Sequence, residues 1–262
     1  MRRTSRNALI RATGTLARIR GATGGKRAIA FHEVPDISRF EGFIDWLLSE
    51  YEIVGLDDWL DGPAGKRTQL LLTFDDGYAA WQTAVAPLLA DRNVPAVFFV
   101  TSGLVGLTGE NATTFARERL LRTQELKFIS LNQLRDLAAH DSFEIGSHTR
   151  THPDLARVQS REALRDEVVG PRASLEDWLG APVRAFAYPF GTPANVPDIV
   201  RSVLEEGGFE AAFTLIPGGW ATAQGDRLRI GRDALDPAFG RGLARAWLRG
   251  GYDRLYALKT GA

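Results

Sequence analysis

The feature that most constrains the fold is an alternation of short β-rich runs with amphipathic helical patterns along most of the 262 residues. A strand followed by a helix, repeated many times, is typical of a parallel sheet with its helices outside. The alternation predicts an α/β fold, an irregular (β/α) barrel of seven to eight parallel strands, and a doubly wound sheet is the alternative. The expected strands are Ala28–Phe31, Tyr51–Val54, Gln69–Phe74, Ala96–Thr101, Ser142–Gly146, Arg184–Tyr188, Ala211–Leu215 and Leu228–Gly231.

Helical periodicity lies between these strands, and some of its ends carry recognisable signals. Ser130 and Ser160 stand where helix N-caps are expected, and Gly207 with Gly208 would stop a helix. The stretch Ser102–Thr123 has no strong period, and we expect a long loop or lid there. The expected helices are Arg39–Ser49, Tyr78–Asp91, Leu131–Ala139, Ser160–Leu179 and Val196–Glu206.

The supply of reactive side chains limits the kinds of site that this chain can build. It has no cysteine and only four histidines. Without cysteine there is no disulfide, no thiolate nucleophile and no zinc site with Cys ligands. A bound metal would therefore need imidazole and carboxylate ligands.

Two of the expected strands run into groups of side chains that can bind metals or move protons. The third strand is followed by Asp75-Asp76-Gly77, and the fifth by a segment with His148 and His152. Functional residues of β/α barrels gather at the C-terminal ends of the strands, so these groups should meet. Asp76 with both histidines would leave one coordination position open, as catalytic metal sites do. Alone, Asp-Asp-Gly is also a common turn, and the histidines could be a surface pair.

These segments also resemble a known family. Thr73–Tyr78 and Ser147–Pro153 resemble the first two motifs of the NodB-homology polysaccharide deacetylases, and Phe186–Gly191 resembles the third. The opening Ala28–His32 is similar to the strand with which many members begin. The three motifs stand in the family's order, and the resemblance covers residues 27–235.

The resemblance implies a metal-dependent hydrolase that removes N-acetyl groups from an acetylated amino sugar in polysaccharide or glycolipid assembly. Asp76, His148 and His152 would hold a divalent metal ion, with Zn²⁺ expected and Co²⁺ or Ni²⁺ as alternatives. Asp75 would be the general base toward water, and the backbone N–H of Phe190 would stabilise the oxyanion. The alternative functions are an O-acetyl esterase or non-sugar amidase on the same fold, and a sugar-binding pseudoenzyme.

Two parts of the family's pattern are missing. No histidine follows His152, so the late Leu-x-x-His motif that supplies a general acid is absent, and Ala187 stands where the third motif usually has arginine. His32 ends the first strand and could protonate the leaving amine instead. Arg232 follows the last expected strand and could keep Asp75 ionised. The alternatives are a histidine hydrogen-bonded at the barrel rim and a structural ion pair.

Both ends of the chain are basic although its net charge is zero. We divide it into a basic amphipathic N-terminal segment (1–26), the deacetylase domain (27–237) and a basic amphipathic C-terminal helix (238–262). The terminal segments could pack on the barrel or on another subunit, or could lie on an anionic membrane, where the sugar would be lipid-linked. We expect no nucleic-acid partner. The sequence shows no transmembrane or secretory segment, which predicts a cytoplasmic location, peripheral on the inner membrane face if the lipid contact holds.

Overall fold

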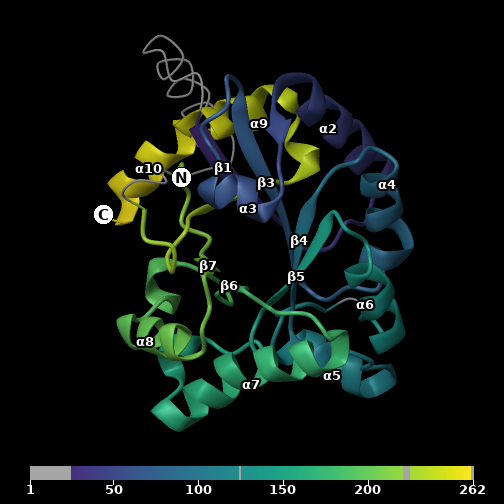
Figure 1. The fold of residues 1–262 in the computed structure, drawn as a ribbon, viewed down its shortest axis with the longest axis vertical. Coiled ribbons are helices and arrows are strands. Elements are labelled where there is room, and N and C mark those ends of the chain that lie inside the picture. The colour runs from purple at the N-terminus through teal and green to yellow at the C-terminus, as the bar shows by residue number, and fades with distance from the viewer. Residues whose placement is uncertain (1–24, 124, 221–224, 261–262) are drawn as a thin grey trace.

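The computed structural model describes residues 25–123, 125–220 and 225–260, and their centre is a nearly closed barrel of seven parallel strands (Figure 1). The barrel order is β8-β1-β3-β4-β5-β6-β7, and the short strand β2 pairs with the first half of β3. This confirms the predicted irregular (β/α) barrel. The strands are β1 (Gly25–Phe31), β2 (Glu52–Ile53), β3 (Thr68–Asp76), β4 (Ala96–Val100), β5 (Phe143–Ser147), β6 (Ala185–Ala187), β7 (Ala211–Phe213) and β8 (Arg232–Ala234).

The barrel closes through the segment that leads into β8. The Thr214 N–H donates to the Ile230 carbonyl at 2.7 Å, which joins this segment to β7. Two residues later β8 pairs with β1, where Ala28 lies opposite Arg232. The bounds predicted for the last strand, Leu228–Gly231, were therefore wrong, because this stretch makes only a single bridge to β7 and the ladder with β1 starts after Gly231.

Two apolar cores hold the barrel. The interior is filled mainly by small residues of the strands around the rings of Phe99 and Phe213. Helix α3 (Leu56–Asp61) places the fully buried Trp59 in the same cluster, and its indole N–H donates to the Arg27 carbonyl near the start of β1. A larger core lies between the barrel and the outer helices. The barrel interior is thus packed. The candidate site residues lie at the carboxyl ends of the strands, opposite the end where Trp59 packs.

The outer helices follow the predicted pattern with some changes at their ends. Ser130 and Ser160 are N-caps as predicted, and Gly207 ends α8. The helix expected from Tyr78 is a π-helical turn (Trp81–Val85) that continues into α4. The outer helices are α2 (Ile37–Glu50), α4 (Ala86–Ala90), α6 (Leu131–Ala138), α7 (Arg161–Leu179) and α8 (Asp198–Glu206).

The stretch Ser102–Thr123 is not the irregular loop that the sequence suggested, because it contains helix α5 (Gly109–Glu118). The buried face of α5 consists of Ala112 and Ala116, and such small residues give little apolar periodicity to detect. The carbonyl of Arg119, which directly follows α5, lies 3.2 Å from His152 Nδ1.

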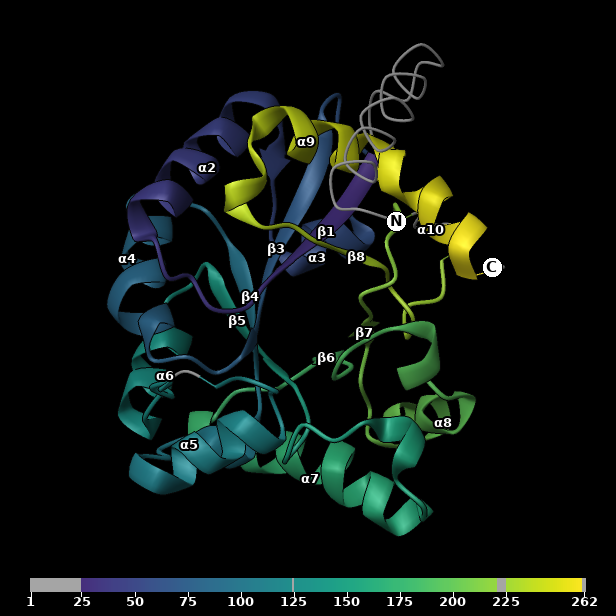
Figure 2. The same ribbon diagram turned by 180° about the vertical axis from the view of Figure 1, so that it is seen from behind.

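The C-terminal region is two helices rather than one. Helix α9 (Arg241–Ala246) continues through a π-helical turn (Trp247–Gly251) into α10 (Tyr252–Thr260), with a kink at Gly250, whose φ is 77°. Both helices lie beside β1, as two opposite views show (Figures 1 and 2). Four large apolar side chains of this region are buried, namely Leu243, Trp247, Leu248 and Leu255, whereas Leu258 of α10 is 84% exposed.

Polar contacts also attach these helices to the barrel. The buried Arg27 side chain of β1 pairs with Asp233 of β8 and with Asp253 of α10, and the Trp247 indole donates to Asp233. Packing on the barrel is therefore the role that the structure supports for 238–260.

Of the predicted N-terminal segment (1–26), residues 1–24 lie outside the residues that the structure describes. No helix in the described part of the chain is long and apolar enough to cross a membrane.

Candidate metal centre

Three potential metal ligands meet at the carboxyl ends of the barrel strands, as the sequence predicted. Asp76 is the last residue of β3, and His148 directly follows β5. The Nε2 atoms of His148 and His152 each lie 3.6 Å from Asp76 Oδ1. One ligand atom from each residue lies within 4.8 Å of the other two, and all three side chains are buried.

The hydrogen bonds of Asp76 test whether this group fits a cation. Its Oδ2 accepts a hydrogen bond from the Tyr78 hydroxyl at 2.7 Å. Its Oδ1 is buried and has no hydrogen-bond partner among the described residues. An unpaired buried carboxylate oxygen is costly, and a cation between Asp76 and the two imidazoles would remove that cost. Two nitrogen donors and one oxygen donor suit Zn²⁺ and leave a position open.

The backbone orients both imidazoles toward Asp76. His148 Nδ1 lies 2.8 Å from the Ala187 carbonyl, and His152 Nδ1 lies 3.2 Å from the Arg119 carbonyl. With a proton on each Nδ1, the Nε2 lone pairs face the carboxylate, which is the usual support of a histidine ligand. Burial lowers the pKa of His148 and lowers that of His152 to about 4. Both rings are therefore neutral at pH 7, as metal binding requires.

The loop that carries His152 has an unusual backbone held by one glutamate. Thr149 and His152 have φ of 67° and 53°, in the left-handed region, and the Thr149 hydroxyl accepts the His152 N–H at 3.0 Å. Glu167 of α7 accepts the N–H groups of Arg150 and Thr151, at 3.1 and 2.8 Å, and the Thr151 hydroxyl at 2.7 Å. Sequence reasoning missed Glu167, since nothing local marks a helix residue whose partner is a distant loop.

Asp75 lies beside the ligand set in a buried ion pair. The Arg232 guanidinium donates to both carboxylate oxygens of Asp75 at 2.7 Å, and also to the Thr73 hydroxyl and the Thr214 carbonyl. Burial alone would raise the pKa of Asp75, but the charge of Arg232 and its hydrogen bonds lower it to about 2. The sequence suggested this pairing from Arg232 following a strand. In the structure Arg232 is the first residue of β8, which aims it into the barrel.

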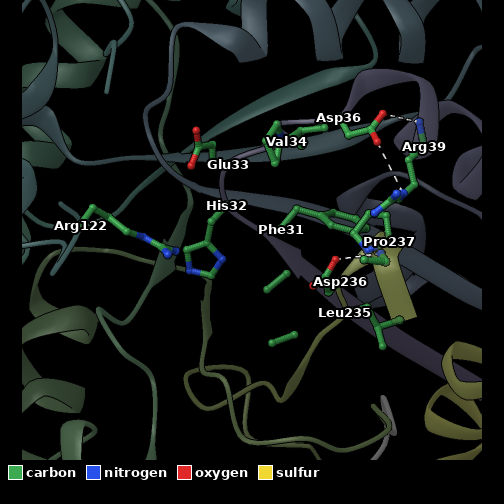
Figure 3. A pocket seen from close by; sticks show the side chains of 14 residues that line it. Phe31, His32, Glu33, Val34, Asp36, Arg39, Arg122, Leu235, Asp236 and Pro237 are labelled. Atoms are coloured by element: carbon green, nitrogen blue, oxygen red, sulfur yellow. Dashed lines mark hydrogen bonds and ion pairs between the residues drawn. The ribbon is translucent and has the colours of Figure 1, made fainter. Parts of the chain in front are cut away.

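His32 reaches the same place from β1. Its Nε2 lies 3.9 Å from Asp75 Oδ2, and its side chain is 32% exposed. It lines an open cavity of about 470 Å³ between the segment after β1 and the segment after β8, which we call the His32 cavity (Figure 3). Side chains on its wall include Asp36, Arg39, Arg122 and Asp236. His32 therefore has access to both Asp75 and solvent.

Phe190 lies beside the candidate ligand His152. Its φ is 61°, and its ring centroid lies 4.8 Å from that of His152. Its backbone N–H has no acceptor among the described residues. Phe190, His152 and Leu121 line a second open cavity of about 730 Å³, the His152 cavity. One cavity thus includes His32, which lies beside Asp75, and the other includes the candidate ligand His152.

Fold and site together define a β/α barrel with a candidate metal centre of two histidines and one aspartate. Residues 62–214 match the family described as polysaccharide deacetylase, more than half of the chain. The chain therefore belongs to the polysaccharide deacetylase family.

Curated relatives and a solved structure agree with this assignment. The chain is 24% identical over 233 residues to the poly-beta-1,6-N-acetyl-D-glucosamine N-deacetylase of Escherichia coli K12, covering 73% of this chain and 34% of that protein. It is 26% identical over 168 residues to the chitooligosaccharide deacetylase of a Bradyrhizobium species, covering 64% and 65%. The chain thus spans about a third and just under two thirds of these relatives. The structure of IcaB from Ammonifex degensii matches with a TM-score of 0.67 and 25% identity, over 86% of this chain and 97% of that one.

Proposed function

We propose that this chain is a metal-dependent hydrolase that removes N-acetyl groups from an acetylated amino sugar. The observation that carries the proposal is the pairing of two carboxylates with different surroundings. Asp75 is held ionised by Arg232, and Asp76 presents an unpaired buried oxygen to two neutral imidazoles. Such a division suits one carboxylate that accepts protons and another that binds a metal.

Asp76, His148 and His152 would hold the ion, with Zn²⁺ the expected metal. When bound, a divalent ion polarises the acetyl carbonyl and lowers the pKa of water. Asp75 accepts the proton of the attacking water. A carboxylate with a pKa near 2 is always ionised at neutral pH, although it is a weaker base for the same reason.

Two further groups complete the reaction. The Phe190 N–H, which has no acceptor among the described residues, donates to the oxyanion of the tetrahedral intermediate. His32 donates a proton to the amine nitrogen while the carbon–nitrogen bond breaks, which leaves acetate and a free amino sugar. Its partial exposure lets it regain that proton from solvent.

The substrate class follows from the relatives and from the site's shape. The names of the relatives refer to poly-beta-1,6-N-acetyl-D-glucosamine and to chitooligosaccharides. Two open cavities, one at His32 and one at His152, favour an oligosaccharide, or a sugar joined to a lipid carrier, over a single free sugar. We therefore propose N-acetylglucosamine-containing chains as the first substrates to test.

The test measures acetate release by the Zn²⁺-loaded protein from N-acetylated and O-acetylated oligosaccharides. We expect Asp75→Asn to lower kcat on the N-acetylated substrate by about a hundredfold or more, while Zn²⁺ binding persists. Asp136→Asn, an exposed change on α6, is the matched control and should leave kcat unaltered. Full activity in Asp75→Asn would refute the mechanism. Release from O-acetylated sugars alone would make the chain an esterase, and no release from either would favour a sugar-binding pseudoenzyme.

A further inference from the structure

The loop after α5 separates the two cavities and sends consecutive side chains into different ones. Leu121 has a φ of 56°, a conformation that costs a non-glycine residue about 1–2 kcal/mol. Its side chain, which is 72% exposed, lines the His152 cavity, whereas that of Arg122 lines the His32 cavity. The loop is fixed by the Arg122 N–H, which donates to the Ala116 carbonyl at 2.9 Å.

Arg122 points toward the imidazole of His32 (Figure 3). Arg122 forms no ion pair with any residue in the part of the chain that the structure describes, and no dashed line reaches it in Figure 3. Three acids line the same cavity: Glu33, which has an interaction of its own, and Asp36 and Asp236, which are engaged elsewhere. Asp36 binds Arg39 and the start of α2, and Asp236 accepts the Ala238 N–H.

A cation held beside the proposed proton donor, in no ion pair with a described residue, suits an anionic part of the ligand. Two more arginines around the site, Arg119 and Arg150, line the neighbouring cavities, and their guanidinium groups form no ion pair among the described residues. Most other arginines of the described chain are paired with carboxylates or bonded to carbonyls, as at Arg92, Arg161 and Arg184. Three arginines without an ion pair among the described residues therefore lie around the cavities through which a ligand would enter.

We propose that Arg122 is a specificity-determining residue that binds an anionic group, a phosphate or a carboxylate, carried by the acetylated sugar on the His32 side of the site. The inference rests on the proposed function. With the acetyl group between Asp75 and the ligand set, and its nitrogen toward His32, the substituents of the same ring or of its neighbour lie in the His32 cavity. The planar guanidinium can then donate two parallel hydrogen bonds to the anion.

The test compares three ligands on the Zn²⁺-loaded protein: a neutral N-acetylglucosamine oligosaccharide, N-acetylglucosamine 1-phosphate, and an oligosaccharide that alternates N-acetylglucosamine with glucuronate. KM and kcat of acetate release are measured for wild type, Arg122→Gln and Arg122→Lys. In Arg122→Gln we expect KM for the phosphate or the uronate ligand to rise about tenfold. KM for the neutral oligosaccharide should stay the same, and Arg122→Lys should retain part of the preference. The ligand whose KM rises in Arg122→Gln identifies the anion.

The matched control is Arg117→Gln, which removes the same charge from an exposed position on α5 that lines neither cavity. Equal effects of Arg117→Gln and Arg122→Gln, or unchanged KM ratios in Arg122→Gln, would overturn the role of Arg122 and leave the proposed function intact.

If no ligand is deacetylated, the proposed function fails, and the dissociation constants of the same ligands decide about Arg122. A selective loss of affinity for an anionic ligand in Arg122→Gln would support the inference. Equal losses for all three ligands, or none, would refute it.

Discussion

Replacing Arg232 with methionine should destabilise the barrel, because it leaves the Asp75 carboxylate buried without its cation. Neither side chain is exposed to more than 1%, and two hydrogen bonds of 2.7 Å join them. Lowering the pKa of Asp75 from 3.8 to about 2 corresponds to about 2 kcal/mol of stability at neutral pH, after the cost of burial. Removing the cation forfeits this and leaves the burial cost unopposed, so we expect a loss of about 3–5 kcal/mol.

Urea denaturation of the metal-free protein at pH 7, followed by circular dichroism, measures this loss in wild type, Arg232→Met, Asp75→Asn and the double variant. The double variant should be more stable than Arg232→Met, since a neutral amide replaces the unpaired charge, and the coupling energy should be about 2 kcal/mol or more. Arg161→Met, which breaks an exposed ion pair with Glu206, is the control and should change stability far less. A loss below about 1 kcal/mol in Arg232→Met, or strictly additive single variants, would refute the reasoning.

Two further predictions concern the same site. The pKa of Asp75 is lower in the folded than in the unfolded protein, so the ionised carboxylate stabilises the fold fully above about pH 4, and this stabilisation disappears as the pH falls toward 2. The urea midpoint of the metal-free protein should therefore drop more steeply over that range in wild type than in Arg232→Met. Parallel curves would contradict this. Glu167→Gln removes the charged acceptor that holds the His152 loop, and it should weaken Zn²⁺ binding about tenfold, measured in competition with a chelator. Glu162→Gln, an exposed change on the same helix, is the control and should leave Zn²⁺ affinity unaltered. Equal affinities in both variants would exclude a positioning role for Glu167.

The sequence was sufficient to predict those residues of the candidate site that stand directly at the end of a strand. Asp75 and Asp76 close a long apolar strand, and His148 follows another, so the common direction of parallel strands brought them together without knowledge of the contacts. The strands themselves were recognisable from short β-rich runs.

Other features depend on contacts that no local pattern encodes. The bounds of β8 were wrong because only three residues pair with β1. Helix α5 was missed because its buried face is alanine, and Glu167 because its partners lie on a loop that only the packing of α7 brings near. Arg122 gave no signal either, since its place beside His32 depends on the backbone turn at Leu121.

The distribution of backbone strain gives independent support for a working site. Six non-glycine residues of the described chain have positive φ, and all but Asn93 surround the candidate metal centre: Asp76, Leu121, Thr149, His152 and Phe190. At about 1–2 kcal/mol each, the five positions together cost an amount comparable with the whole stability of many domains. Such conformations persist where surrounding contacts fix them, as the Thr149 hydroxyl and Glu167 do here. Three of them place the atoms that the proposed reaction needs, the Asp76 oxygen, the His152 nitrogen and the Phe190 N–H. The strained positions are therefore the ones that the proposed hydrolase reaction would use.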